Sequence, residues 1–185
     1  MSLLPLIQPG EGDEAQNAFL AKVPPLNLFK ALAHAPQAAA LTAEYGAMVL
    51  YRTALDPKLR ELAILRAAHM AGSAYEVGHH ERIGRDVGLT GAQLAAVRND
   101  GDIHALSTPE RIVVQWAEEV GLDGQASRRL VVEAVEAFGL ARTVELSLAV
   151  GYYLMVASFL NTFRVPFEGP GFSDGVDINA RPRGA

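Results

Sequence analysis

Four residues in the middle of the chain carry side chains that suit proton transfer. Glu76 and His80 are four positions apart, and Ser73 precedes Glu76 by three. On one helix these offsets place a hydroxyl, a carboxylate and an imidazole along a single face. Glu61 lies in the preceding helical segment, from which its carboxylate could reach the imidazole of His80. A glutamate–histidine pair fixes the imidazole tautomer and raises its basicity, which suits general acid–base chemistry near neutral pH.

These residues define the expected catalytic roles. We expect His80 to act as general acid or base, Glu61 to orient its imidazole, and Glu76 to be a second group that handles a proton. Two carboxylates beside one imidazole would push their pKa values apart. Without further context, however, Glu76 and His80 would be an ordinary solvated pair on a helix surface.

Substrate-binding groups are expected next to the catalytic ones. We assign this role to Ser73, Tyr75 and His79, although a lone histidine such as His79 is more often a helix-surface residue. An anionic substrate would also need a cation. The basic candidates, which no spacing argument ranks, are Arg60, Arg66, Arg82 and Arg164.

The absence of cysteine limits the chemistry further. The 185 residues include no cysteine, which removes thiol catalysis and thiolate metal sites. His69, Glu76 and His80 would share one face if a single helix ran through all three, and this arrangement is the one metal site the sequence permits. Its offsets of seven and four are not a dedicated zinc spacing, so we expect neither a metal nor another cofactor.

The same intervals resemble a known family. Alkylhydroperoxidase D proteins have a glutamate, then two cysteines separated by two residues, then a histidine, and these positions correspond to Glu61, Ser73, Glu76 and His80. The flanking phrases RELAILRAAH, GSAYEVGHH, GLTGAQLAAV and FLNTFRVPFE look like the subgroup called carboxymuconolactone decarboxylase family proteins. The resemblance extends from about Leu26 to Glu168.

The resemblance implies an all-α helical bundle and a choice of functions. Serine and glutamate cannot cycle as a dithiol, so alkylhydroperoxidase activity by that route is excluded. The decarboxylase branch implies a lyase that uses Glu61 and His80 on a small carboxylated lactone or another substrate derived from an aromatic compound. Two alternatives stay open: a non-catalytic member that binds a small molecule, and peroxide chemistry by a non-thiol route through a bound metal.

Helix starts and stops are marked clearly along the chain. Asp13, Asp56 with Pro57, Thr90 and Thr108 with Pro109 predict helix starts, because side-chain oxygens cap free N–H groups and proline suits the first turn. Gly72 and Ser73 predict either a kink or a break after which Ser73 caps a new helix. Helices are expected over about 13–22, 28–33, 36–54, 57–71, 73–87, 90–97, 109–120, 126–138 and 141–162. No segment alternates like a strand, which predicts an all-α fold, a single domain of about eight helices.

This pattern gives three segments: an extended lead-in over 1–12, a carboxymuconolactone decarboxylase-like helical domain over 13–165, and an irregular tail over 166–185. The apolar run 146–160 is short for a membrane span and is expected to be a buried core helix. Tyr152, Tyr153, Met155 and Phe159 in this helix are interpreted as core or subunit interface. A shift of 84 residues lays Glu61 on Glu145, so Glu145 would be the structural echo of a decayed duplication.

Charge and composition bound the partners. There are 16 Lys and Arg against 21 Asp and Glu, and the basic residues are scattered, so nucleic acid is not expected as a partner. The N-terminus lacks a basic region and its apolar stretch is interrupted by Pro5, which predicts a cytoplasmic protein without a membrane association. A hydrophobic fraction of 50% favours a homo-oligomer, whether dimer, trimer or hexamer. The other expected partner is a small-molecule substrate.

Overall fold

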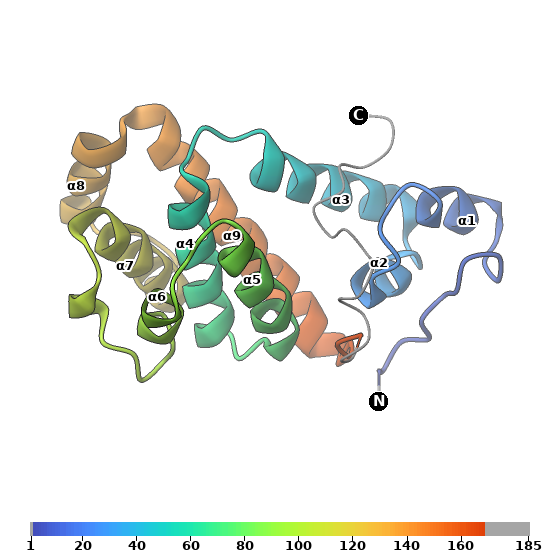
Figure 1. Ribbon diagram of the computed structural model, residues 1–185. Coiled ribbons are helices and arrows are strands. Elements are labelled where there is room, and N and C mark those ends of the chain that lie inside the picture. The colour runs from blue at the N-terminus through green and yellow to red at the C-terminus, as the bar shows by residue number, and fades with distance from the viewer. Residues whose placement is uncertain (1, 169–185) are drawn as a thin grey trace. The chain divides into compact units, whose positions relative to one another are not determined.

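The computed structural model describes residues 2–168, and all of the regular secondary structure in that range is helical (Figure 1). It contains nine α-helices, close to the eight expected, together with one short 3-10 helix, and no β-strand lies within the described residues. The α-helices are α1 (Glu14–Leu20), α2 (Asn27–Leu32), α3 (Pro36–Tyr51), α4 (Pro57–Met70), α5 (Ala74–Asp86), α6 (Gly91–Ala96), α7 (Thr108–Asp123), α8 (Arg128–Phe138) and α9 (Leu140–Phe163). The all-α prediction is therefore confirmed.

The contacts between residues gather the chain into two compact units, a division that the sequence did not predict. Among the described residues, the first unit comprises 2–52 and 160–168, and the second comprises 53–159. Most of the predicted tail, from 169 onward, lies outside the described residues. The domain boundaries proposed from the sequence stay a prediction.

The first unit has a small core of its own. α1 and α2 each contact α3. Phe19, Leu20, Ala33 and Ala39 are buried together there. Asp13 caps α1 as predicted, because its side chain accepts a hydrogen bond from the N–H of Gln16 at 2.9 Å.

The second unit is built around α4, which contacts both α5 and α7. Asp56 accepts from the N–H groups of Lys58 and Leu59, at 2.8 and 3.3 Å, and Pro57 begins the helix, as the sequence predicts. The buried apolar residues come from α4, α7, α8 and α9, and include Leu62, Leu65, Val113, Val114, Trp116, Leu130, Leu146 and Val150. Because apolar neighbours surround α4, a polar group on it is held in a dry environment.

The connection between α4 and α5 is a break and not a kink. Gly72 has a φ of +63°, a left-handed conformation that favours glycine, and its N–H donates to the carbonyl of His69 at 3.1 Å. Ser73 then caps α5 by accepting from the N–H of Glu76 at 3.4 Å. Of the two alternatives at this point, helix termination with a new cap is the one observed.

The start of α7 differs by one residue from the sequence prediction. Ser107, not Thr108, is the capping residue, and its N–H and hydroxyl both donate to the carboxylate of Glu110. The reciprocal arrangement explains the shift, because Glu110 stands three residues after Ser107 in the pattern of a capping box.

Helix α9 has one buried and one exposed side. Leu146, Val150, Val156 and Leu160 are buried, whereas Leu140, Val144, Leu148 and Met155 are exposed. α9 is the one helix among residues 2–168 with the length and composition of a membrane span, although 50% of its most apolar stretch is buried inside the protein. Core helices of globular proteins have the same character, so this feature is weak evidence for a membrane.

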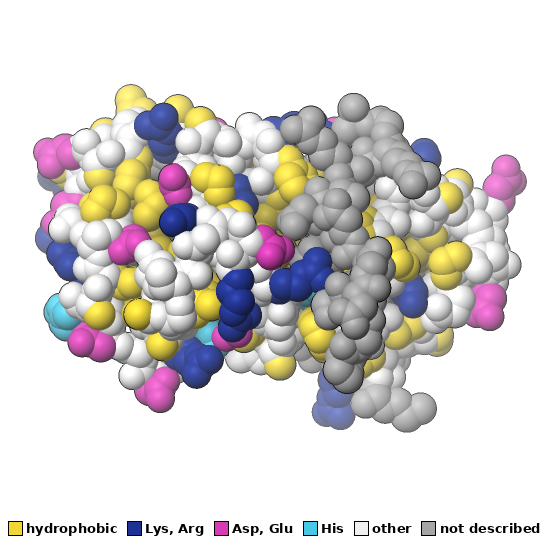
Figure 2. All heavy atoms as spheres, viewed as in Figure 1, with side chains coloured by type: hydrophobic (Ala, Val, Ile, Leu, Met, Phe, Trp, Pro, Cys, Tyr) yellow, Lys and Arg dark blue, Asp and Glu magenta, His cyan; other side chains and the backbone are white. Residues whose placement is uncertain are grey.

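The face of the second unit seen in Figure 2 does not concentrate charge of one sign. In the part of Figure 2 that shows the second unit, basic and acidic side chains are interspersed. Ion pairs such as Arg85–Glu81 and Arg129–Glu133, at 2.9 and 2.7 Å, join neighbouring turns of one helix. Their solvent exposure makes each worth about 0.3–0.5 kcal/mol.

Candidate active site

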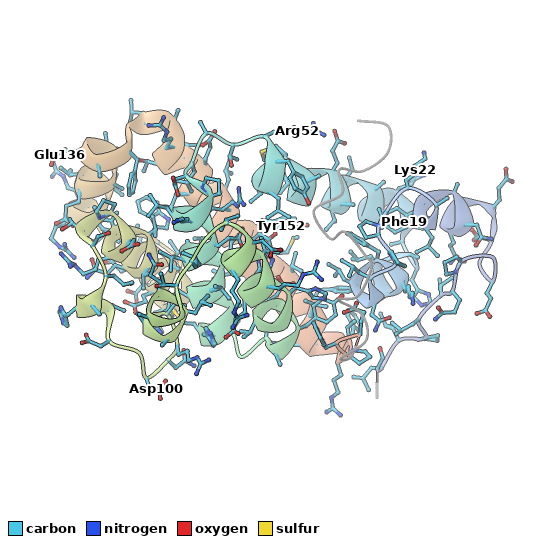
Figure 3. All side chains as sticks on the ribbon, in the orientation of Figure 1. Phe19, Lys22, Arg52, Asp100, Glu136 and Tyr152 are labelled. Atoms are coloured by element: carbon cyan, nitrogen blue, oxygen red, sulfur yellow. The ribbon has the colours of Figure 1, made fainter. Side chains whose placement is uncertain are left out.

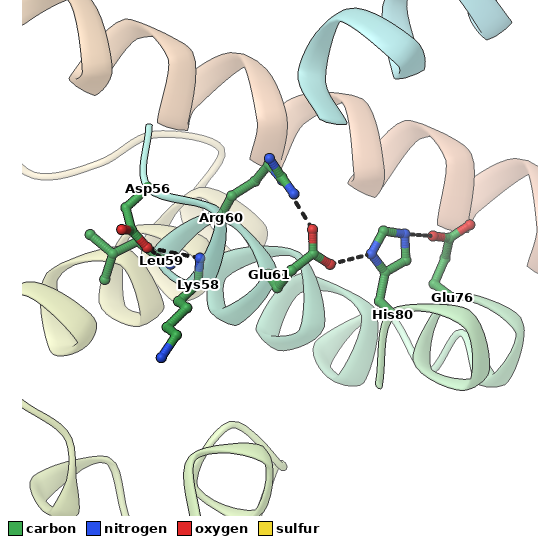
Figure 4. Close-up of polar contacts among 7 residues, drawn as sticks. All are labelled: Asp56, Lys58, Leu59, Arg60, Glu61, Glu76 and His80. Carbon is green, nitrogen blue, oxygen red and sulfur yellow. Dashed lines mark hydrogen bonds and ion pairs between the residues drawn. The ribbon is translucent and has the colours of Figure 1, made fainter. Parts of the chain in front are cut away.

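His80 lies between two carboxylates in the interior of the second unit (Figure 4). Its Nδ1 is 2.7 Å from Oε2 of Glu61, and its Nε2 is 3.3 Å from Oε2 of Glu76. The exposed fractions of Glu61, Glu76 and His80 are 0%, 3% and 4%. The structure therefore brings together the three residues that the sequence assigned to catalysis, one from α4 and two from α5.

Arg60 completes a row of alternating charges. Its Nε–H donates to Oε1 of Glu61 at 3.0 Å, and the arginine is itself only 5% exposed (Figure 4). The two oxygens of Glu61 thus face two different cations, Arg60 on one side and His80 on the other. When His80 is protonated, two positive and two negative charges cancel within the cluster, which offsets the cost of burying them.

The carboxylates control the charge of His80. Burial by itself lowers the pKa of the imidazole, but the charge and hydrogen bond of Glu61, followed by those of Glu76, outweigh burial and raise the pKa to about 9. His80 is consequently an imidazolium at neutral pH, with one N–H directed at each carboxylate. In that state it can release a proton but cannot accept one, so its charge favours the acid over the base among the two predicted roles.

The residues predicted to bind substrate occupy the first half of α5. Ser73 is fully buried and caps the helix, which gives its hydroxyl a structural task. Tyr75 and His79 are buried as well, and their rings lie 4.7 Å apart. Their role in substrate binding stays a prediction.

The basic candidates separate by position. Arg60 adjoins Glu61, as described above. Arg66 pairs with Glu118 at 2.7 Å and donates to the carbonyls of Val97 and Arg98. Arg82 is half-buried on α5, and Arg164 belongs to the first unit. Arg60 therefore directly contacts one of the predicted catalytic residues, Glu61.

The helix continuity needed to align His69 with Glu76 and His80 is not observed. α4 ends at Met70 and α5 begins at Ala74, so His69 stands on a different helix from the other two. Within residues 2–168, no group of three or more histidine, aspartate or glutamate side chains is placed to hold a metal ion. Burial lowers the pKa of His69 despite the opposing charge of Glu81.

Tyr153 is a neighbour of the site that sequence reasoning missed. Its ring centroid lies 4.6 Å from that of His80, with the planes at 81°, so one ring presents its edge to the other. The sequence interpretation placed Tyr153 in the core or a subunit interface; it is buried, but against the candidate catalytic histidine. The sequence did contain an indication of this role. Tyr153 places a polar phenol among the buried Ala, Val and Leu residues of α9, and a polar group in such a position often has a functional role.

Glu145, which the sequence suggested as the echo of an internal duplication, has a structural role. Its Oε2 accepts the backbone N–H groups of Ala54 and Leu55, at 2.9 and 2.8 Å, and so holds the segment that leads into α4. Arg142, one turn earlier on α9, donates to the carbonyl of Ala54 at 3.1 Å. These contacts anchor the entry to the helix that carries Glu61.

The helices, within the described residues, form an all-α protein with the fold of alkylhydroperoxidase D-like structures, and a buried Glu–His–Glu row lies inside it. Residues 36–119 match the model of the carboxymuconolactone decarboxylase family. The match contains Arg60, Glu61, Glu76 and His80. No curated protein matches the chain.

Two solved structures share the fold. A protein of unknown function from Agrobacterium tumefaciens, whose description relates it to the antioxidant defence protein AhpD, has a TM-score of 0.69 and 18% identity, over 75% of this chain and 96% of its own. An uncharacterised peroxidase-related protein from Ralstonia eutropha, described as an alkylhydroperoxidase AhpD core, has a TM-score of 0.75 and 15% identity, over 90% and 92%. At these identities the likeness concerns the fold alone.

Proposed function

We propose that this protein is an acid–base enzyme of the carboxymuconolactone decarboxylase type, acting on a small carboxylated lactone. The observation that carries the proposal is the position of His80, buried between the carboxylates of Glu61 and Glu76. The family match supports the class of substrate. The absence of both thiols directs the chemistry away from the dithiol peroxidase reaction.

The proposed reaction loses carbon dioxide and takes up one proton. The bond between the ring carbon and its carboxylate breaks, and its electron pair passes into the ring, conjugated with the lactone carbonyl. The proton on Nε2 of His80 then moves to a ring carbon, and His80 regains a proton from solvent. Glu61 holds the His80 ring in place throughout, in both its charged and its neutral form. Glu76 directs the proton from solvent back to Nε2 of His80.

A turnover assay with carboxylated five-membered lactones tests this proposal. Carbon dioxide release should fall by about 10²–10⁴-fold in His80→Gln, because general acid catalysis is worth about that much. His104→Gln is the matched control, since His104 is exposed and lies outside the site. If wild type and His104→Gln both turn over the lactone and His80→Gln does so equally well, His80 is not the acid.

A second candidate is a protein that binds a small molecule without turning it over. The burial of Glu61, His80 and Glu76 favours this candidate. Both ring nitrogens of His80 already face a carboxylate, and Glu76 is only 3% exposed. Saturable binding of a carboxylated lactone without release of carbon dioxide would support this candidate over the enzyme.

A further inference from the structure

Tyr153 occupies an unusual place for a phenol. It is 5% exposed and lies in α9, with its ring centroid 4.6 Å from that of His80 and 5.1 Å from that of Tyr152, which is labelled in Figure 3. Its position is thus fixed by two aromatic contacts and not by its hydroxyl.

The hydroxyl makes no hydrogen bond to another of residues 2–168, and its oxygen is not among the fully buried polar atoms of these residues that lack a partner. A phenol usually finds a hydrogen-bond partner inside a protein, because its hydroxyl is polar while its ring is apolar. An unpaired phenol beside a candidate catalytic histidine is therefore available to a group that enters the site.

The electrostatic surroundings decide what this phenol can offer. Burial, and then the charges of Glu76 and Glu61, raise the pKa of Tyr153 well above its usual value. The phenol stays protonated throughout the range in which proteins work, so it can donate a hydrogen bond. An incoming oxygen atom is the acceptor that it lacks.

Building on the proposed function, we propose that the Tyr153 hydroxyl donates a hydrogen bond to the substrate oxygen on which negative charge forms. In the reaction above, the electron pair released with carbon dioxide passes through the ring to the lactone carbonyl oxygen and makes a lactone enolate. Tyr153 stabilises that oxygen without giving up its proton, and the pair returns to carbon when His80 protonates the ring. The site then selects small lactones that can form an enolate.

Glu61 and Glu76 cannot perform this task, because ionised carboxylates only accept hydrogen bonds. Figure 4 shows them on opposite sides of the His80 ring, each facing one ring nitrogen. The contact between the rings of Tyr153 and His80 places a second hydrogen-bond donor, the phenol, near the imidazolium. The phenol provides the hydrogen bond that stabilises the enolate oxygen. The imidazolium then provides the proton that converts the enolate to product.

Binding of tetronate, the stable anion of a five-membered lactone enol, tests the inference without relying on turnover. Isothermal titration would compare the wild type, Tyr153→Phe and the matched control Tyr152→Phe, which removes the adjacent phenol of the same helix. We expect Tyr153→Phe to bind tetronate about 10- to 100-fold more weakly, as for a lost hydrogen bond to a charged group. Tyr152→Phe should stay within about threefold of wild type.

Two further measurements guard against a folding defect. Tyr153→Phe should unfold at the same urea concentration as wild type or a higher one, because the lost hydroxyl makes no hydrogen bond. Replacing Tyr153 with 3-fluorotyrosine, whose phenol is more acidic and donates more strongly, should tighten tetronate binding.

The outcomes separate this inference from the proposed function. Equal tetronate binding by wild type and Tyr153→Phe, or no binding by wild type, overturns the role of Tyr153. Weakened binding in Tyr153→Phe supports that role even if no lactone loses carbon dioxide, in which case the decarboxylase proposal alone fails.

Discussion

Nδ1 of His80 lies 2.7 Å from Oε2 of Glu61, although 19 residues and a helix break separate them in the chain. The pair is fully enclosed, and Arg60 contacts the other oxygen of the same carboxylate. Three ionisable groups from two helices thus lie in direct contact. Changing Glu61 should alter both the stability of the protein and the titration of His80.

Stability should fall as the solution becomes more alkaline. The pKa of His80 is about 9 in the folded protein against 6.5 in the unfolded chain, so its stabilising contribution is complete below 6.5 and is lost as pH rises through 9. The loss corresponds to about 3 kcal/mol. Urea unfolding at about pH 6 and about pH 9.5 measures it, with His104→Gln as a control expected to keep the loss. A free energy of unfolding that stays constant over this range would contradict the prediction.

Glu61→Gln should lower the pKa of His80, because it removes the largest favourable charge on the imidazole. It should also reduce the free energy of unfolding by about 3–5 kcal/mol, since Arg60 loses its buried partner. NMR titration of the His80 ring and urea unfolding test the two effects. Glu136→Gln, an exposed change on α8, should leave both unchanged, and an unaltered titration in Glu61→Gln would refute the coupling.

Glu145→Ala should destabilise the entry to α4. The substitution removes the acceptor of the Ala54 and Leu55 N–H groups, at a cost of about 1–3 kcal/mol. Urea unfolding measures the change, and Glu136→Ala serves as the control on a neighbouring helix. A variant as stable as wild type would mean that water replaces the carboxylate without loss.

Ser73→Ala should cost about 1 kcal/mol, because Ser73 caps α5. Ser158→Ala, an exposed serine within α9, is the comparison in which no cap is lost. Tetronate titration of the same variants distinguishes the two roles of Ser73: a loss of binding beyond the loss of stability would show that the hydroxyl also meets the substrate.

Much of this structure could be predicted from local sequence signals. Asp56 with Pro57 located the start of α4, and Gly72 with Ser73 located the place of the break but left a kink as the alternative. Both signals are local, because they rest on backbone hydrogen bonds within a few residues. Glu76 and His80 share a helix, so their offset of four was sufficient. The pairing of Glu61 with His80 came from the family intervals, since no local rule fixes a contact across a break.

The contribution of α9 could not be predicted in the same way. Tyr153 is 73 residues beyond His80, and its spacing in α9 is that of an ordinary core residue. Only the packing of α9 in the second unit shows that its ring meets the imidazole. The division of the chain near Arg52 was also missed, because it follows from the distribution of contacts and not from a run of Gly and Pro.

The three residues that join α4 to α5 fix where the second helix starts relative to the first. Adding or removing a single residue between Met70 and Ala74 would disrupt the hydrogen bonds of Gly72 and Ser73 that hold this turn, and would carry His80 away from Glu61. Substitutions at Gly72 or Ser73 would weaken the protein while the pairing survived, whereas a one-codon insertion would abolish the pairing outright. Insertions and deletions should therefore be rejected at 71–73.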